Sequence, residues 1–194
     1  ECKLIEDKNI CISSDKKGIL RKVSTGPIIA ISPFNFPLNL ALHKIAPAFA
    51  IGTSVVLKAS PFTPLSAIKL QELVNRAGFP ENSLQVVNCS NELSESLVKD
   101  PRFSMLSFTG SPQIGWMLKG LIGKKKLALE LGGNAPVIIE DASDLASVAK
   151  LVANGAYLYA GQICISTQRI LVNENLKEGF QSLLITEIEK IPIG

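Results

Sequence analysis

The sequence predicts an α/β fold in which crossover helices connect the strands of a parallel sheet. Short apolar runs rich in β-branched residues alternate with longer segments whose apolar residues recur at helical spacing. Each helical segment separates two strand-like runs, and parallel strands need such a crossover connection. A chain of 194 residues with 46% apolar residues is long enough to enclose this sheet in a core.

The elements follow in order from a different kind of N-terminal segment. Residues 1–25 alternate short apolar patches with charges, which predicts extended segments or a hairpin around residues 13–18, although a loosely attached polar ribbon fits the same pattern. From Gly26 the pattern becomes regular. Strand-like runs cover residues 28–31, 54–58, 84–87 and 105–108, and helical segments cover residues 38–51, 65–77, 92–99 and 112–122.

The last third of the chain continues the alternation. Two strand-like runs, 127–131 and 136–139, precede an apolar helical run over residues 145–159. Asp141-Ala142-Ser143-Asp144 offers N-cap residues for that helix. A strand over 169–172 and a helix over 176–190 complete the predicted elements.

Composition excludes several function classes. The net charge of +3 is too small and dispersed for nucleic acid, and Lys124-Lys125-Lys126 fits a solvated turn better than a phosphate site. No apolar run reaches the roughly 18 residues of a membrane span, and the charged start lacks the layout of a signal peptide, so we expect a cytoplasmic protein. Irregularly spaced cysteines and a single histidine indicate neither a disulfide framework nor a metal site; the cysteines are Cys2, Cys11, Cys89 and Cys164.

One cysteine is set apart by its surroundings. The turn Gly161-Gln162-Ile163-Cys164-Ile165-Ser166 follows the long apolar helical run. A free cysteine is usually just a small buried hydrophobe. Three further polar interruptions of apolar segments weigh against that reading: Ser32-Pro33-Phe34-Asn35-Phe36-Pro37, Phe108-Thr109-Gly110-Ser111 and Glu130-Leu131-Gly132-Gly133-Asn134.

In this order, and followed by the cysteine turn, these motifs resemble the aldehyde dehydrogenase superfamily from about Gly26 to the C-terminus. Within this superfamily, the residues of these motifs most resemble the branch of lactaldehyde, semialdehyde and non-phosphorylating glyceraldehyde-3-phosphate dehydrogenases. The resemblance implies a Rossmann-like NAD(P)-binding domain over residues 26–131 and the start of a second α/β domain, the catalytic domain, over 132–194. Residues 1–25 look like part of the arm through which family members associate, so we expect a homo-oligomer at full length.

The resemblance also assigns catalytic roles. Cys164 matches the nucleophile, because addition of a thiolate gives an aldehyde the tetrahedral form that expels hydride and leaves a hydrolysable thioester. Asn35 matches the side-chain donor to the oxyanion, with the backbone N–H of Cys164 as the second donor. Glu130 matches the general base that activates water, and it disfavours relatives that pass the acyl group to coenzyme A.

Cofactor residues follow from the same resemblance, since no Gly-x-Gly-x-x-Gly follows the first strand-like run. Lys58 matches the lysine that contacts the adenosine ribose, and Gly110 and Ser111 lie at a helix N-terminus that suits a pyrophosphate, although an ordinary capped helix fits them as well. NAD-preferring relatives carry a glutamate where this chain has Pro61, so NAD and NADP both remain open. The remaining expected contacts are Ser60 for a phosphate, Gly132 beside the nicotinamide, and Ser32 and Phe34.

Two readings of the function remain. The first is NAD(P)-dependent oxidation of a small aldehyde to a carboxylic acid, by this chain or by an enzyme of which it is the core. The second is a non-catalytic nucleotide-binding or assembly module derived from such an enzyme, which the shortness of the chain favours. The mechanism needs no histidine, so His43 and Lys44 receive a structural or substrate-edge role.

Overall fold

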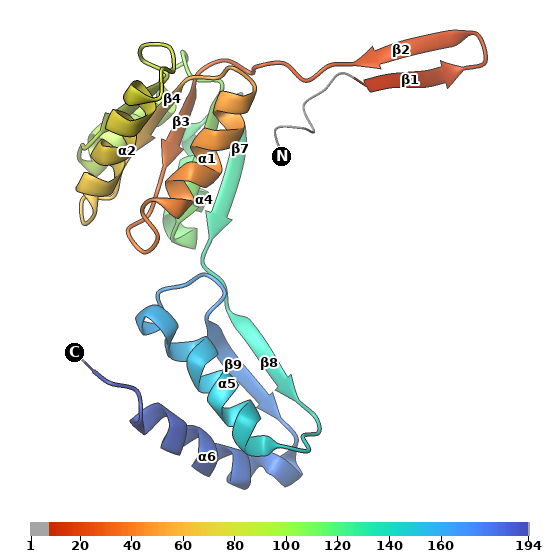
Figure 1. Cartoon of the computed structure of the whole chain (residues 1–194), viewed down its shortest axis with the longest axis vertical. Coiled ribbons are helices and arrows are strands. Elements are labelled where there is room, and N and C mark those ends of the chain that lie inside the picture. Colours follow the sequence, from red (N-terminus) through yellow and green to blue (C-terminus); the bar gives the residue numbers. More distant parts are fainter. Residues whose placement is uncertain (1–7, 194) are drawn as a thin grey trace. The chain divides into compact units, whose positions relative to one another are not determined.

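The computed structural model describes residues 8–193, and the chain divides into two compact units between Leu131 and Gly132. The first unit contains a β-hairpin and a five-stranded sheet with its helices, and the second contains a two-stranded sheet with its helices (Figure 1). Residues 1–7 of the expected arm lie outside the described residues. None of the helices in the described part of the chain is long and apolar enough to cross a membrane.

The sheet of the first unit is parallel throughout, with strand order β5-β4-β3-β6-β7. Its strands are β3 (Ile28–Ile31), β4 (Val55–Lys58), β5 (Leu84–Val87), β6 (Met105–Gly110) and β7 (Lys126–Leu131). The chain runs outward from β3 to β5 and then crosses to the other side of β3 at β6. The carboxyl ends of β3 and β6 therefore form a topological switch point, where open α/β sheets bind their ligands.

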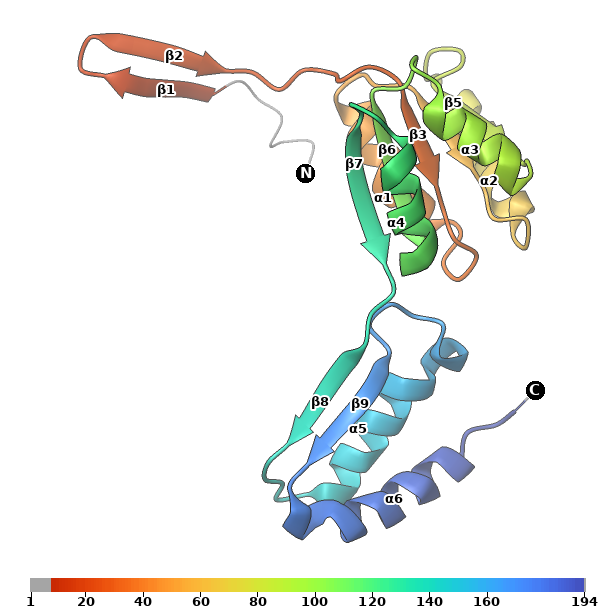
Figure 2. The same cartoon turned by 180° about the vertical axis from the view of Figure 1, so that it is seen from behind.

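Helices cover both faces of this sheet (Figures 1 and 2). Alternate residues of β3 point to opposite faces, so Ile28 and Ala30 enter one core cluster and Ile29 and Ile31 enter another. The first cluster includes residues of α1 (Asn39–Ala50) and α2 (Pro64–Arg76), and the second includes residues of α3 (Asn91–Lys99) and α4 (Pro112–Leu121). Burial on both faces explains why β3 is a continuous apolar run in the sequence.

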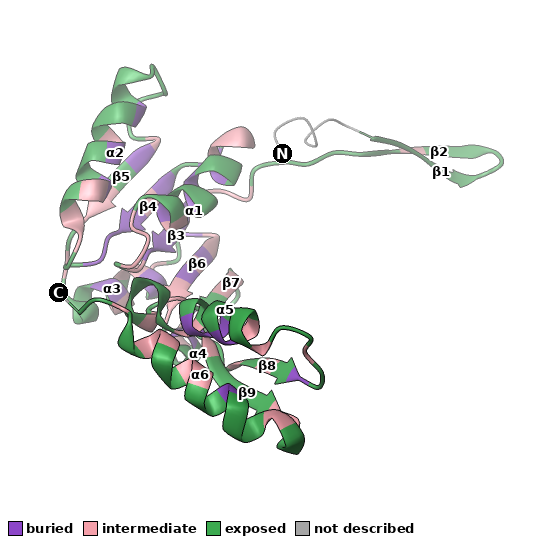
Figure 3. Ribbon diagram, turned by 60° about the horizontal axis from the view of Figure 1, so that its bottom comes forward, coloured by how far each residue is buried: buried purple, intermediate pink, exposed green. Residues whose placement is uncertain are grey.

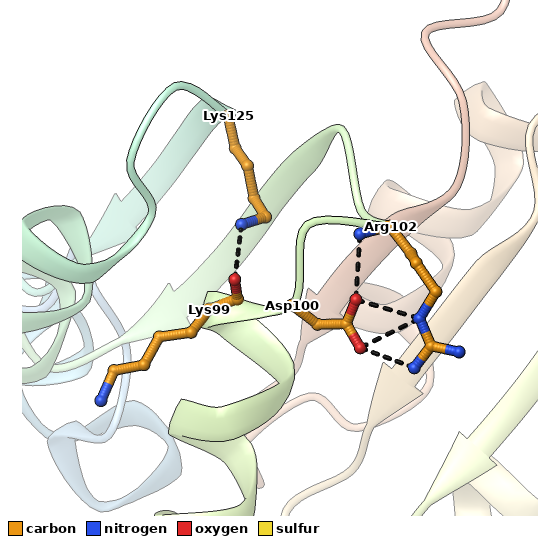
Figure 4. Close-up of polar contacts among 4 residues, drawn as sticks. All are labelled: Lys99, Asp100, Arg102 and Lys125. Carbon is orange, nitrogen blue, oxygen red and sulfur yellow. Dashed lines mark hydrogen bonds and ion pairs between the residues drawn. The ribbon is translucent and has the colours of Figure 1, made fainter.

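A hydrogen-bonded segment closes the amino-terminal edge of this sheet. Asp100 follows α3 and accepts hydrogen bonds from the backbone N–H and the guanidinium of Arg102, at 2.9 Å and 2.6 Å for the shortest of each (Figure 4). The Lys125 ammonium donates to the carbonyls of Lys99 and Ile122, at the ends of α3 and α4. Lys125 therefore caps two helices, which agrees with a structural role for the lysine run.

The N-terminal segment is a hairpin, one of the two forms expected for it. Strand β1 (Lys8–Ser13) pairs antiparallel with β2 (Lys16–Leu20), with an irregularity between Cys11 and Ser13. Its residues are almost all exposed, as the green ribbon of Figure 3 shows.

The second unit is a β-α-β motif followed by a helix. Strand β8 (Ala135–Ile139) pairs in parallel with β9 (Thr167–Val172), and α5 (Leu145–Tyr157) makes the crossover. The predicted N-cap of α5 is confirmed at Asp144, because the Asp144 carboxylate accepts a hydrogen bond from the Ser147 N–H at 3.0 Å. The short η3 (Glu174–Leu176) leads into α6 (Lys177–Glu189), whose Phe180 packs with Ile139, Ala149 and Val152 in a small core.

The predicted helix over residues 145–159 ends earlier than its apolar pattern suggests. Regular helix stops at Tyr157, and the 3-10 segment η2 (Leu158–Gly161) contains non-helical residues. Tyr159 and Ala160 have φ values of 56° and 55°, in the left-handed region that side chains rarely adopt. The prediction was wrong here because apolar periodicity does not register a change in backbone handedness.

Candidate active site

Most predicted site residues of the first unit lie at the carboxyl edge of its sheet. Ser32 directly follows β3 and is buried, and its N–H donates to the Lys58 carbonyl at 3.2 Å, which continues the pairing of β3 with β4. Lys58, the last residue of β4, is also buried. Ser60 lies two residues further on, buried, with its hydroxyl accepting a hydrogen bond from the Phe62 N–H. The structure thus brings Ser32, Lys58 and Ser60 to neighbouring strand ends.

The loop after β3 carries Asn35 in a fixed orientation. Its side-chain oxygen accepts a hydrogen bond from the Phe36 N–H at 3.1 Å. The preceding Phe34 is 40% exposed and meets the ring of Phe62 edge to face, with 5.8 Å between centroids. An oxyanion needs a hydrogen-bond donor, so the nitrogen is the end of the Asn35 side chain that suits it.

The turn after β6 has the geometry of a capped helix. The Ser111 hydroxyl accepts a hydrogen bond from the Ile114 N–H at 3.4 Å, and Pro112 opens α4 without an N–H of its own. Gly110 is required by its surroundings, because a Cβ there would lie 2.5 Å from the Phe108 ring. The role of Gly110 and Ser111 at a pyrophosphate stays a prediction.

A buried lysine connects α1 to this edge, and the sequence reasoning gave it only a minor role. Lys44 is 6% exposed, and its ammonium donates to the Thr109 hydroxyl at 2.6 Å and to the Ser107 hydroxyl at 3.3 Å. Burial lowers the pKa of Lys44 to about 8, and attraction to Glu130 opposes that shift. The sequence did contain a signal for this burial, because Lys44 falls on the same face of α1 as the apolar residues Ala41, Ile45 and Ala48, all of which are buried.

Glu130 belongs to the same polar cluster. It pairs in register with Thr109 across β6 and β7, so both side chains point to the same face of the sheet. Its neighbours Leu129 and Leu131 pack on the opposite face with α4. Glu130 is exposed, and its carboxylate faces the side of the sheet that α1 covers. The structure therefore brings a carboxylate and a buried cation together at the carboxyl edge.

Cys164 and Gly132 lie in the second unit. Cys164 is exposed on a turn closed by a hydrogen bond from the Ser166 N–H to the Ile163 carbonyl at 3.0 Å. Glycine is needed at position 133, because a Cβ there would lie 2.8 Å from the carbonyl oxygen of Cys164. Gly133 thus allows its backbone to lie close to the backbone of Cys164. The Cys164 thiol is presented at the surface of the second unit.

No group of three or more His, Cys, Asp or Glu side chains within residues 8–193 is arranged to hold a metal ion. Ser32 and Lys58 lie at the paired carboxyl ends of β3 and β4, next to the switch point between β3 and β6, which is where open α/β sheets bind their ligands.

Comparison with known proteins gives a consistent picture. The chain matches the aldehyde dehydrogenase family over residues 1–194. It is 40% identical over 183 residues to the 3-sulfolactaldehyde dehydrogenase of Priestia aryabhattai, covering 94% of this chain and 38% of that enzyme. The lactaldehyde dehydrogenase of Methanococcus maripaludis is 39% identical over 179 residues, covering 90% of this chain and 38% of that enzyme, so the branch that the motifs suggest is confirmed among the relatives.

Solved structures agree. The glyceraldehyde-3-phosphate dehydrogenase GapN of Methanocaldococcus jannaschii, solved with NADP, superimposes with a TM-score of 0.92 at 34% identity, covering 100% of this chain and 43% of that one. An indole-3-acetaldehyde dehydrogenase solved with NAD+ gives a TM-score of 0.92 at 31% identity, covering 99% and 40%. The chain spans about two fifths of the length of these proteins.

The α/β prediction with a Rossmann-like parallel sheet is confirmed by these superpositions. The family match covers the hairpin, the parallel sheet and the cysteine turn alike. From the motifs, the fold and these similarities together, we conclude that the chain belongs to the aldehyde dehydrogenase family.

Proposed function

We propose that this chain supplies the cofactor site and the catalytic residues for NAD- or NADP-dependent oxidation of an aldehyde to a carboxylic acid. The observation that carries the proposal is the family match over residues 1–194, with Asn35, Glu130 and Cys164 all retained. Relatives acting on sulfolactaldehyde and glyceraldehyde-3-phosphate support a short, polar aldehyde as the substrate.

Cys164 starts the reaction in this proposal. Its thiolate adds to the carbonyl carbon, which forms the S–C bond and places the electron pair of the C=O bond on oxygen. Exposure of Cys164 on a tight turn suits this attack. Free cysteine is only a few per cent ionised at neutral pH, so deprotonation of the thiol precedes the addition.

Asn35 stabilises the oxyanion that results. The hydrogen bond from the Phe36 N–H to its side-chain oxygen supports this role, because it orients the amide before substrate arrives. Collapse of the oxyanion then breaks the C–H bond and leaves a thioester on Cys164. Bound NAD or NADP supplies the ring that accepts the departing hydride.

Glu130 completes the reaction as a general base. It takes a proton from water, whose oxygen attacks the thioester carbon, and the C–S bond breaks to return the thiolate and release the carboxylic acid. The neighbouring Lys44 supports this role, since its ammonium holds positive charge beside the carboxylate.

The cofactor would contact Ser32, Phe34, Lys58 and Ser60 at the carboxyl edge, with Gly110 and Ser111 at its phosphates and Gly132 near the nicotinamide. Pro61 occupies the position where a carboxylate would repel a 2′-phosphate, so we propose that NADP is accepted as well as NAD. Structural relatives bind each of these cofactors, which supports either choice.

The test is turnover by the intact protein and two cysteine variants. Reduced cofactor is followed with glyceraldehyde, lactaldehyde and succinate semialdehyde, using NAD and NADP separately. Cys164→Ser should lower kcat by a factor on the order of 10³ or more while leaving cofactor affinity within a few fold. Cys89→Ser is the matched control, because Cys89 is a half-buried thiol of the first unit with Ser94 as its neighbour.

Each outcome decides between the readings. Loss of turnover in Cys164→Ser alone supports the proposal, and full turnover in that variant refutes the role of Cys164. Saturable cofactor binding by the unaltered protein, measured by calorimetry, without turnover of any aldehyde would favour the nucleotide-binding module instead.

A further inference from the structure

The cysteine turn is attached to the end of α5 through one buried hydroxyl. Ser166 is 2% exposed, and its hydroxyl donates to the Ala156 carbonyl at 2.8 Å, with the Gly155 carbonyl at 3.4 Å. Carbonyls in the last turn of a helix have no partner within the helix, so a side-chain donor satisfies them well. A hydroxyl carries a single proton, and the shorter contact identifies Ala156 as its main acceptor.

The other end of the same loop converges on the same carbonyl. Gly161 has a φ of 71°, and a Cβ there would lie 3.1 Å from the Ala156 oxygen and 3.7 Å from the Ser166 hydroxyl. Residues 161 and 166 thus approach the end of α5 together. The segment between them, which contains Cys164, starts and ends close to the Ala156 carbonyl.

The segment before Gly161 does not hold the loop by regular structure. Tyr159 and Ala160 share left-handed φ values with Gly161, so the right-handed helix α5 does not continue into the loop. Within the cysteine turn the Ser166 N–H donates to the Ile163 carbonyl, and the Ser166 hydroxyl connects the turn to α5. On the far side, Gly133 packs against the Cys164 carbonyl.

We propose that Ser166 is a positioning residue for Cys164, whose hydroxyl anchors the cysteine turn to the Ala156 carbonyl at the end of α5. The inference rests on the proposed role of Cys164 as the nucleophile. Displacing a reacting group by about 1 Å costs a factor on the order of 10² in rate, so a loosened turn lowers the rate of attack. Cofactor affinity should stay nearly unchanged, because every proposed cofactor contact except Gly132 belongs to the first unit.

The experiment compares Ser166→Ala with a matched control in the intact protein. Ser182→Ala removes another hydroxyl of the second unit that donates to a backbone carbonyl, that of Glu178 at 3.0 Å. Ser166→Ala should lower kcat and the rate of the first turnover about 10- to 100-fold, with cofactor affinity changed less than about twofold. Ser182→Ala should leave all three quantities near the unaltered values.

Ser166→Cys tests the same bond with a side chain of nearly the same shape, and it serves where the alanine variant does not fold. A thiol is a weak donor, so kcat should still fall at least about fivefold at an unchanged cofactor affinity. Ser166→Thr keeps the hydroxyl and should restore kcat to within about threefold of the unaltered protein.

The inference is overturned if kcat of both Ser166→Ala and Ser166→Cys stays within twofold of the value for the unaltered protein. It is also overturned if the cofactor affinity of these variants falls in parallel with kcat. Its failure is distinct from failure of the proposed function. Full turnover in Cys164→Ser refutes both the role of Cys164 as the nucleophile and the positioning role of Ser166. Loss of turnover in Cys164→Ser, together with an unchanged kcat in Ser166→Ala, refutes only the role of Ser166.

Discussion

Replacing Lys44 with methionine should stabilise the first unit at neutral pH and weaken the pH dependence of its stability. The pKa of Lys44 falls from 10.5 to about 8, first because of burial and against the attraction of Glu130. At 1.36 kcal/mol for each pKa unit, the buried charge costs about 3 kcal/mol at pH 7. Hydrogen bonds to Thr109 and Ser107 favour the ammonium and offset part of this cost, so a net gain of about 1 kcal/mol is expected for the variant.

The sign of the pH dependence follows from where the proton binds. The folded pKa lies below the unfolded one, so the unfolded chain binds the proton more tightly. The cost is fully present below pH 8 and disappears as pH rises toward 10.5. Between pH 7 and pH 9.5 the stability of Lys44→Met relative to the unaltered protein should therefore fall by about 2 kcal/mol, which turns a gain of about 1 kcal/mol into a loss of about 1 kcal/mol.

Urea unfolding at these two pH values measures the effect, followed by the fluorescence of Trp116, which lies on α4 of the first unit. Lys69→Met is the control, because the Lys69 side chain is 64% exposed and pairs only with Glu72 across the helix surface. The reasoning is refuted if the advantage of Lys44→Met is the same at both pH values. It is equally refuted if the stability of Lys69→Met relative to the unaltered protein falls by the same amount between the two pH values.

Three other changes test separate parts of the molecule. Glu130→Gln should lower kcat by about 10²- to 10⁴-fold and let the thioester accumulate, seen as one rapid equivalent of reduced cofactor; an unchanged steady state would contradict its role as base. Pro61→Glu should lower kcat/KM with NADP at least about tenfold and leave NAD nearly unchanged, because the new carboxylate repels a 2′-phosphate; equal effects on both cofactors would count against this assignment. The hydrogen bond from Arg102 lowers the pKa of Asp100 to about 2 from 3.8, so the pair stabilises the fold above pH 3.8. Thermal melting temperatures of Asp100→Asn and the unaltered protein should then converge as pH falls toward 2, whereas a gap that persists there would disprove the link.

Much of the first unit follows from its sequence. Strand β3 occupies the predicted residues 28–31, because an apolar run buried on both faces leaves one reading. The carboxyl-edge placement of Lys58 and Asn35 follows from the same alternation. Strand order does not, since the crossing from β5 to β6 depends on how helices pack on the two faces.

The parts that sequence reasoning missed depend on contacts between distant residues. Lys44 is separated by 65 positions from Thr109, and lysine is ordinarily exposed, so its burial had only a weak signal. The link from Ser166 to Ala156 joins residues on the two sides of the left-handed stretch at Tyr159, Ala160 and Gly161. Local periodicity cannot register either, because each is produced by tertiary packing.

The two-stranded sheet determines how the second unit should behave when it is produced by itself. Within residues 8–193 no further strand pairs with β8 or β9, and Ile138 of β8 and Leu171 of β9 are 73% and 51% exposed. Open strand edges flanked by apolar side chains act as templates for strands of other chains. Two strands are also fewer than a free-standing sheet needs. When this unit is produced by itself, precipitation through edge pairing is the physical outcome to expect, and charged substitutions at those two positions are the direct remedy.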